Sequence, residues 1–132
     1  MRLGLKLTAT LLAFLVCPAA ARAQAEPPAP YDPFRAEKNI EIGEYYLKKK
    51  NYDAAIERFK EAIRYKPNFA RPHFLLGEAY EKKGDKAEAV NYYQKYLEIL
   101  PAAEDAAKVR KRIEKLQREM MRQTAGRKLP SG

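Results

Sequence analysis

The sequence contains one cysteine, one histidine and no tryptophan among its 132 residues, and these scarcities exclude several kinds of chemistry. A single cysteine cannot close an intramolecular disulfide or supply a zinc site made of several thiolates. The single histidine, His73, has no evident partner with which to act as a catalytic base. The sequence also has no H-E-x-x-H pattern, no G-x-S-x-G pattern and no glycine-rich phosphate loop. We therefore expect that the protein is not an enzyme and that it has no catalytic residue, no bound cofactor and no metal site.

The first 23 residues have the features of a secretory signal peptide. Arg2 and Lys6 form a positive beginning, residues 7–16 form an apolar run, and residues 21–23 read Ala-Arg-Ala, which is a cleavage pattern. The apolar run is too short to span a bilayer, although an uncleaved anchor remains the alternative. Cys17 follows Val16 and precedes Pro18, which is a poor match to a lipid-attachment site. Cleavage would remove Cys17, so the mature chain would have no thiol.

The charge of the chain is strongly positive. Lys and Arg number 26 and Asp and Glu 17, which gives a net charge of +9, and the residues after 23 carry about +6 of it. Basic clusters at residues 48–50, 82–83 and 110–112 could bind phosphate groups. Because an exported chain would not meet cytoplasmic nucleic acid, we expect no nucleic-acid partner. Anionic lipid headgroups, cell-wall polymers or acidic proteins are better candidates.

The remaining chain shows helical periodicity interrupted at defined positions, and it shows no strand pattern. Residues 24–33 are rich in Pro and Ala and predict an extended linker that ends in Asp32-Pro33, a helix cap followed by proline at the first helical position. Asn51 and Asp85 are predicted caps of later helices, and Gly84 suits a left-handed turn position. Helices are expected to stop before Pro67 and Pro101 because proline cannot continue a helix as a donor.

A further helix is predicted near the C-terminus, at residues 104–122. One apolar stripe runs along it, and charged residues occupy the other positions. The stripe consists of Val109, Ile113, Leu116 and Met120. Residues 123–132 have no periodic pattern and are expected to be a disordered tail.

Two segments of the chain match each other at a spacing of 34 residues without a gap. Gly43 aligns with Gly77, Ala55 with Ala89, and Pro67 with Pro101. A helical pair cannot bury its apolar faces alone, so copies of such a pair stack on one another. We expect Gly43 and Gly77 to let the first helix of each pair approach the second.

This pattern resembles the tetratricopeptide repeat family, whose period is 34 residues. In repeat 36–69 the signature of the family falls on Ile42, Gly43, Tyr46, Ala55, Phe59, Ala62 and Pro67, and in repeat 70–103 it falls on Leu76, Gly77, Tyr80, Ala89, Tyr93 and Pro101. The resemblance implies an all-α fold: a short α-solenoid of two helical hairpins at residues 34–103, followed by a capping helix. A standard third repeat is not expected, because Arg110 and Lys111 stand where Leu and Gly are usual.

The family binds peptides or partner helices in a concave groove lined by the first helix of each pair. Carried over by position, the groove consists of Glu37, Ile40, Glu44, Leu47, Arg71, Phe74, Glu78 and Lys82, and Lys108 and Arg112 extend it along the cap. Ile40, Leu47 and Phe74 would offer apolar contact, and the alternative is that they pack against the N-terminal segment 31–34. Most tyrosines fall at core spacing, so a role in the core is favoured over one as stacking platforms.

Three functions remain open from the sequence. The first is a non-catalytic scaffold for protein partners in the bacterial periplasm, associated with the outer membrane or its protein assembly. A weaker resemblance supports it, to bacterial envelope tetratricopeptide proteins such as the outer-membrane barrel-assembly lipoprotein. The second is a basic protein that binds anionic lipid or cell-wall glycan. The third is a non-catalytic subunit of an envelope enzyme complex.

Overall fold

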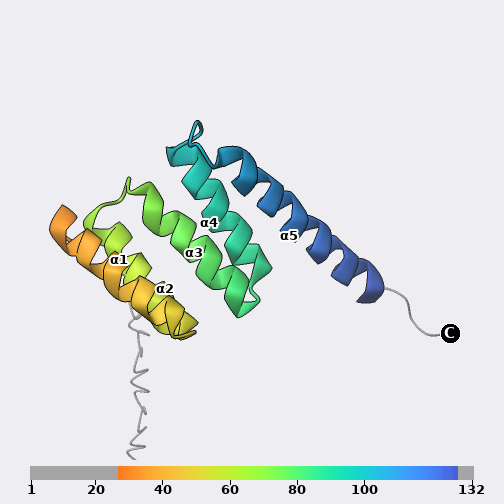
Figure 1. Ribbon diagram of the computed structural model, residues 1–132, viewed down its shortest axis with the longest axis horizontal. Coiled ribbons are helices and arrows are strands. Elements are labelled where there is room, and N and C mark those ends of the chain that lie inside the picture. The colour runs from red at the N-terminus through yellow and green to blue at the C-terminus, as the bar shows by residue number, and fades with distance from the viewer. Residues whose placement is uncertain (1–26, 128–132) are drawn as a thin grey trace, which may run out of the picture.

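The structure is a computed structural model that describes residues 27–127, and these residues form five α-helices and no strand. The helices are α1 (Pro33–Lys48), α2 (Tyr52–Tyr65), α3 (Ala70–Lys83), α4 (Lys86–Ile99) and α5 (Ala106–Arg127). Helices α1 and α2 form one hairpin, α3 and α4 form the second, and α5 runs along the outer side of the second (Figure 1). The expected all-α solenoid of two hairpins and a closing helix is confirmed. The predicted signal peptide, residues 1–23, lies outside the described residues.

The helix ends follow the local chemistry of the sequence. The carboxylate of Asp32 accepts a hydrogen bond from the Arg35 amide at 2.9 Å, and Pro33 is the first residue of α1. Asn51 and Asp85 cap α2 and α4 in the same way. Gly84 follows α3 with a φ angle of +93°, in the left-handed region where a residue without Cβ has no steric cost. These four predictions are confirmed.

Within each hairpin, a glycine lies directly against an aromatic ring of the second helix. A Cβ atom built on Gly43 would lie 2.4 Å from the Phe59 ring, and one built on Gly77 would lie 2.5 Å from the Tyr93 ring. Both rings are completely buried. The predicted close approach of the two helices is therefore confirmed, and it depends on the absence of a side chain at these two positions.

The core consists of two clusters of buried side chains. The first joins the first hairpin to α3 and includes Ala36, Ile40, Ala55, Phe59 and Leu76. The second joins the second hairpin to α5 and contains Ala70, Ala89, Val90, Tyr93, Tyr96, Val109, Ile113 and Leu116. Each hairpin thus completes its core with a helix that comes from the next unit, so we expect the two hairpins to depend on α5 for stability.

Helix α5 is longer than the sequence suggests. It begins at Ala106 and ends at Arg127, whereas we predicted a capping helix at residues 104–122 and a disordered tail from residue 123. The prediction was wrong for residues 123–127, because a lack of apolar periodicity does not end a helix that meets no strong stop signal. The Thr124 hydroxyl, which donates to the Met120 carbonyl at 3.1 Å, lies in this last part.

The N-terminal segment lies at the edge of the first hairpin. Residues 27–32 have no regular structure, and the amide of Asp32 donates to the carbonyl of Tyr65 at 3.0 Å. Tyr31 and Phe34 are 70% and 81% exposed, so they do not cover the apolar residues of α1 and α3 as one alternative proposed. Among residues 27–127, no helix has the length and apolar character needed to cross a membrane.

Candidate functional site

The first helices of the repeats and the closing helix carry the ten predicted groove residues. Four of them are exposed: Glu37, Arg71, Lys82 and Lys108. Five are half-buried: Glu44, Leu47, Phe74, Glu78 and Arg112. The tenth, Ile40, is completely buried.

Ile40 cannot contact a partner, and its assignment to the groove was wrong. Its side chain belongs to the first core cluster, where Ala36 and Gly43 share its face of α1. Residues 36, 40 and 43 follow the spacing of a core stripe, and this local pattern outweighs the position taken from the family. Leu47 packs against the same cluster and is only half-buried.

An ion-pair cluster connects α1 with α3. The Arg71 guanidinium lies 2.7 Å from the Glu44 carboxylate and 3.8 Å from that of Glu37. All three side chains are between 31% and 51% exposed, so solvent screens the pairs and their contribution to stability is small. The ion pairs instead hold three predicted groove residues close together on one face. We call the face formed by α1, α3 and α5 the odd-helix face.

A second cluster connects α3 with α5 on this face. The Arg112 guanidinium lies 2.7 Å from the carboxylate of Glu81 and 3.4 Å from that of Glu78, and 5.4 Å from the centre of the Tyr93 ring. The Tyr93 hydroxyl donates to the Glu81 carboxylate at 2.8 Å. Burial and this hydrogen bond raise the pKa of Tyr93 well above its ordinary value. Arg112 is thus held in place by carboxylates and by an aromatic ring.

Next to this cluster lies a small cavity of about 120 Å³ between α3 and α5, which we call the notch. It is lined by Phe74, Glu78, Asp105, Lys108, Val109 and Arg112. Four of these six residues were predicted from the sequence. Phe74 and Val109 supply apolar surface, and the Phe74 ring is fixed by the rings of Tyr93 and Tyr96, at 5.7 Å and 5.4 Å between centres.

Two lining residues of the notch were missed. Val109 was assigned only to the apolar stripe of the closing helix. Asp105 lies 34 residues after Arg71, which itself lies 34 residues after Glu37, so the repeat period indicated this position. The Asp105 carboxylate accepts a hydrogen bond from the Tyr96 hydroxyl at 2.6 Å, and this bond, together with burial, raises the pKa of Tyr96 to about 12.

The polar groups of the notch differ in whether they already form a hydrogen bond or an ion pair inside the protein. Glu78, Arg112 and Asp105 all have partners inside the protein. Lys108 is exposed and forms no ion pair with the residues that the structure describes. Within residues 27–127, Lys108 is therefore the cation lining the notch that is available to an anionic group. Lys82 is also exposed, but it does not line the notch.

The described residues show no arrangement typical of catalysis. Among residues 27–127, no group of three His, Cys, Asp or Glu side chains could hold a metal ion. His73 is buried in the core, 6.1 Å from the Tyr92 ring, and burial lowers its pKa. Tyr93 and Tyr96 are buried, and Tyr80 stacks on Tyr92 with ring centres 5.5 Å apart, as expected of core residues.

Comparison with known families agrees with this geometry. A TPR repeat model matches residues 43–84, and a tetratricopeptide repeat model matches residues 70–103. One curated relative, the probable UDP-N-acetylglucosamine–peptide N-acetylglucosaminyltransferase SEC of Arabidopsis thaliana, is 36% identical over 62 residues, which are 47% of this chain. The chain spans 6% of the length of that relative, so its transferase activity cannot be carried over from the match. The matched repeats, the 34-residue period and the two glycine–aromatic contacts identify the chain as a tetratricopeptide repeat protein.

Proposed function

We propose that the protein is a non-catalytic scaffold that holds a peptide segment or a helix of a partner protein on its odd-helix face. The observation that carries the proposal is the notch, where an apolar floor is surrounded by fixed charges. An apolar cavity of about 150 Å³ accommodates a molecule of the size of benzene. The notch, at about 120 Å³, has room for one aliphatic side chain of a partner.

The charges around the notch indicate which partner segment would fit. Because Glu78 and Asp105 are engaged by Arg112 and Tyr96, they do not demand a cation from the partner. Among the residues that the structure describes, Lys108 is the cation at the rim without an ion pair. The segment that suits this site best is an aliphatic side chain with an acidic residue close to it. The rim charge would contribute to selection and to the rate of association more than to affinity.

We place this scaffold in the periplasm of a bacterium, and we propose outer-membrane protein assembly as the process in which it takes part. The support comes from the sequence, in the signal-peptide pattern of residues 1–23 and the weaker resemblance to envelope tetratricopeptide proteins. Export would also explain a mature chain without cysteine, whose stability in an oxidising compartment depends on packing alone.

Photo-crosslinking in intact cells tests the proposal. A photoreactive amino acid is placed at position 108, at the rim of the notch, and in a second strain at position 111. Lys111 lies on the same helix, is exposed, and does not line the notch. We expect one protein to be joined specifically at position 108. Equal crosslinking of the same protein at both positions, or none at position 108, would contradict binding at the notch.

A further inference from the structure

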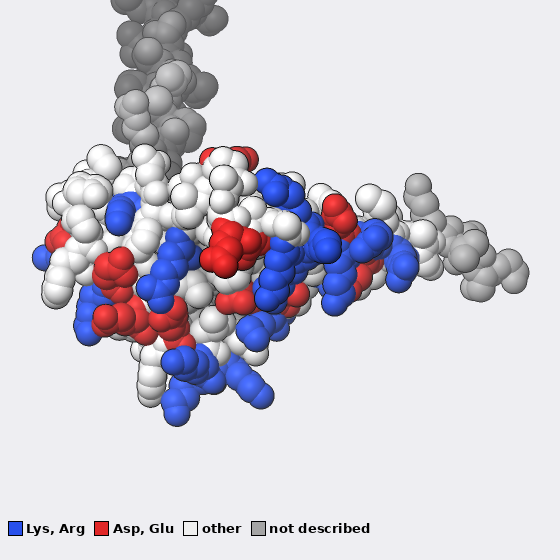
Figure 2. Space-filling model, turned by 45° about the horizontal axis from the view of Figure 1, so that its top comes forward, with Lys and Arg blue, Asp and Glu red and all other residues white. Residues whose placement is uncertain are grey.

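The positive charge of the described chain is concentrated on α5. Residues 27–105 contain 14 Lys and Arg and 14 Asp and Glu, so the two repeats and their connections are neutral. Helix α5 contains eight Lys and Arg and two Glu, which gives it a net charge of +6. In Figure 2 a group of basic side chains, with some acidic ones among them, lies on the part of the surface that leads to the C-terminal end of this helix, and other basic side chains lie elsewhere on the same face. A neutral body thus carries one basic helix.

Four of these cations form a line on the outer face of α5. The apolar stripe Ala106, Val109, Ile113 and Leu116 is buried in the protein. At 3.6 residues per turn, the opposite face presents Lys111, Lys115, Arg118 and Arg122, all of them exposed. We call these four residues the basic ribbon, and it extends over about 16 Å. None of the four forms an ion pair with an acidic residue in the part of the chain that the structure describes.

The absence of ion pairs within the ribbon contrasts with the flanks of the same helix. Arg112 is paired with Glu78 and Glu81, and Glu119 is paired with Lys86 at 3.0 Å. Within the ribbon, like charges follow one another at spacings of three and four residues, where they repel. A helix that served only to cover the core would be more stable with alternating charges in these positions. A hydrogen bond from Lys86 lowers the pKa of the flanking Glu119, and the charges of Lys115 and Arg122 add to this effect. An anionic surface outside the molecule would offset the repulsion that remains within the ribbon.

The shape around the ribbon argues against a packed helix as its ligand. Lys111 occupies the repeat position of Gly43 and Gly77, at which an aromatic ring of the following helix lies against the backbone. The lysine side chain prevents a sixth helix from approaching α5 in this way. In addition, α5 has 22 residues and α4 has 14, so the distal turns of α5 extend beyond α4 (Figure 1). The ribbon therefore lies on an outer edge of the described structure, where no neighbouring helix encloses it.

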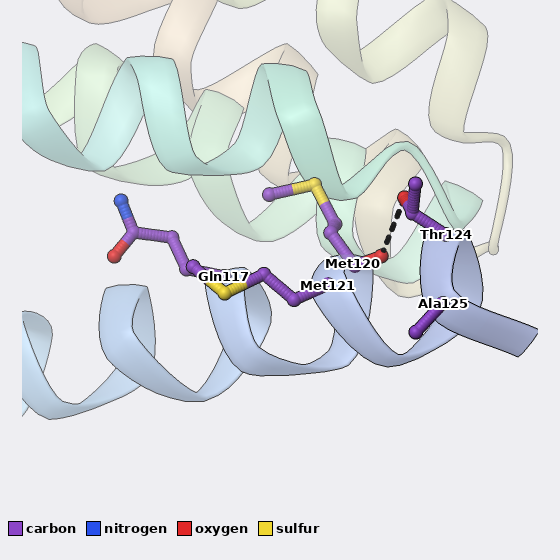
Figure 3. A pocket seen from close by; sticks show the side chains of 5 residues that line it. All are labelled: Gln117, Met120, Met121, Thr124 and Ala125. Carbon is purple, nitrogen blue, oxygen red and sulfur yellow. Dashed lines mark hydrogen bonds between the residues drawn. The ribbon is translucent and has the colours of Figure 1, made fainter.

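An apolar patch accompanies the ribbon at this distal end. Figure 3 shows Met120 pointing from α5 toward the rest of the bundle, whereas Met121 runs along α5 itself. Met121 is 69% exposed and lies between Arg118 and Arg122 in the sequence. Long basic side chains beside an exposed apolar side chain suit the boundary of a lipid bilayer, where cations meet phosphates and the apolar group enters between headgroups.

We propose that the basic ribbon lies on an anionic phospholipid membrane, with lipid phosphates against its four cations and Met121 between the headgroups. The ribbon is on the opposite side of α5 from its buried stripe, and its residues do not line the notch. A protein partner could therefore be held while the membrane is bound. The proposal does not depend on the proposed function.

Vesicle binding by the full chain tests this proposal. Binding is compared between vesicles of phosphatidylcholine alone and vesicles that contain about 30% phosphatidylglycerol, at low salt and at about 0.5 M salt. Each basic residue near an anionic surface strengthens binding about fivefold, so the variant K111Q/K115Q/R118Q/R122Q should lose about 100-fold or more of its preference for anionic vesicles. Residues 1–23 contain three basic residues that are the same in every variant, so a difference in this preference between variants is assigned to the substituted residues.

A matched variant removes the same charge elsewhere. K48Q/K49Q/K50Q/R58Q takes four exposed basic residues from the first hairpin, including another basic cluster of the sequence. This variant should keep the anionic preference within about threefold, because the ribbon is intact. Circular dichroism is used to check that both variants are folded.

Three outcomes would overturn the proposal. The first is equal binding to neutral and anionic vesicles. The second is a loss in the control variant as large as that in the ribbon variant. The third is binding to soluble polyglutamate without binding to anionic vesicles, which would assign the ribbon to an acidic protein instead.

Discussion

Replacing Gly77 with alanine tests the packing on which the repeat fold depends. The new Cβ atom would lie 2.5 Å from two carbon atoms of the Tyr93 ring. That ring is completely buried, its hydroxyl is bonded to Glu81 at 2.8 Å, and the Phe74 ring lies 5.7 Å from it. The ring therefore cannot retreat without breaking a hydrogen bond or displacing a groove residue.

Two opposing effects determine the size of the change. Overpacking of a well-filled core costs about 1–3 kcal/mol, and the short contact favours the upper part of this range. Alanine is preferred over glycine in a helix by about 1 kcal/mol. We expect a net loss of about 1–2 kcal/mol in the free energy of unfolding, and a decrease of about 5–15 °C in Tm for a domain of this size.

Thermal and urea unfolding followed by circular dichroism measures this effect. Gly126→Ala is the matched control, because Gly126 is also helical but its Cβ would meet no atom within 4 Å. The control should leave the stability unchanged or slightly raised. In a Tyr93→Leu background, Gly77→Ala should cost less, because the ring that it meets is gone. A Gly77→Ala protein as stable as the wild type would refute the close approach of α3 and α4.

Three further predictions concern titration and the closing helix. Because burial lowers the pKa of His73, the unfolded chain binds a proton near pH 6.5 that the folded chain does not, so the free energy of unfolding should fall from pH 7 to pH 5. Urea unfolding of His73→Phe should show no such fall, and an unchanged slope would contradict the assignment. Because the pKa of Tyr96 is raised to about 12, the free energy of unfolding should decrease as the pH rises from about 10 to about 12. Tyr96→Phe should make this decrease smaller in the same assay. If the decrease is the same in the variant, Tyr96 does not contribute to it. A chain that ends at residue 103 lacks Val109, Ile113 and Leu116 of the second core cluster and should be poorly folded or self-associated by sedimentation, whereas a monomer that melts cooperatively would show that α5 is dispensable.

Local chemistry is what made much of the fold predictable from the sequence. Asp32, Asn51 and Asp85 cap helices by bonding to an amide three residues away, and such bonds are determined by neighbouring residues alone. Gly43 and Gly77 could be assigned to helix contacts because the 34-residue period places them at equivalent positions. The end of α5 was misplaced, since residues 123–127 show no pattern that distinguishes an exposed helix from a tail.

The candidate site was predictable only in part, because it depends on contacts between distant segments. Position in the family placed Ile40 in the groove, while its own spacing with Ala36 and Gly43 placed it in the core, and the core placement is what the structure shows. The notch exists because the Phe74 ring is held by Tyr93 and Tyr96 from α4 while α5 supplies the opposite wall. No pattern within one helix contains that information.

The most direct test of binding at the notch is the affinity of the partner captured at position 108 for two charge-reversed proteins. Lys108→Glu and Lys111→Glu make the same change in net charge on the same helix, and only the first lies at the notch. We expect Lys108→Glu to weaken binding about tenfold, which corresponds to about 1.4 kcal/mol, and Lys111→Glu to leave the affinity unchanged. Equal weakening by both changes would indicate a general response to charge, and no weakening by Lys108→Glu would place the partner elsewhere on the protein.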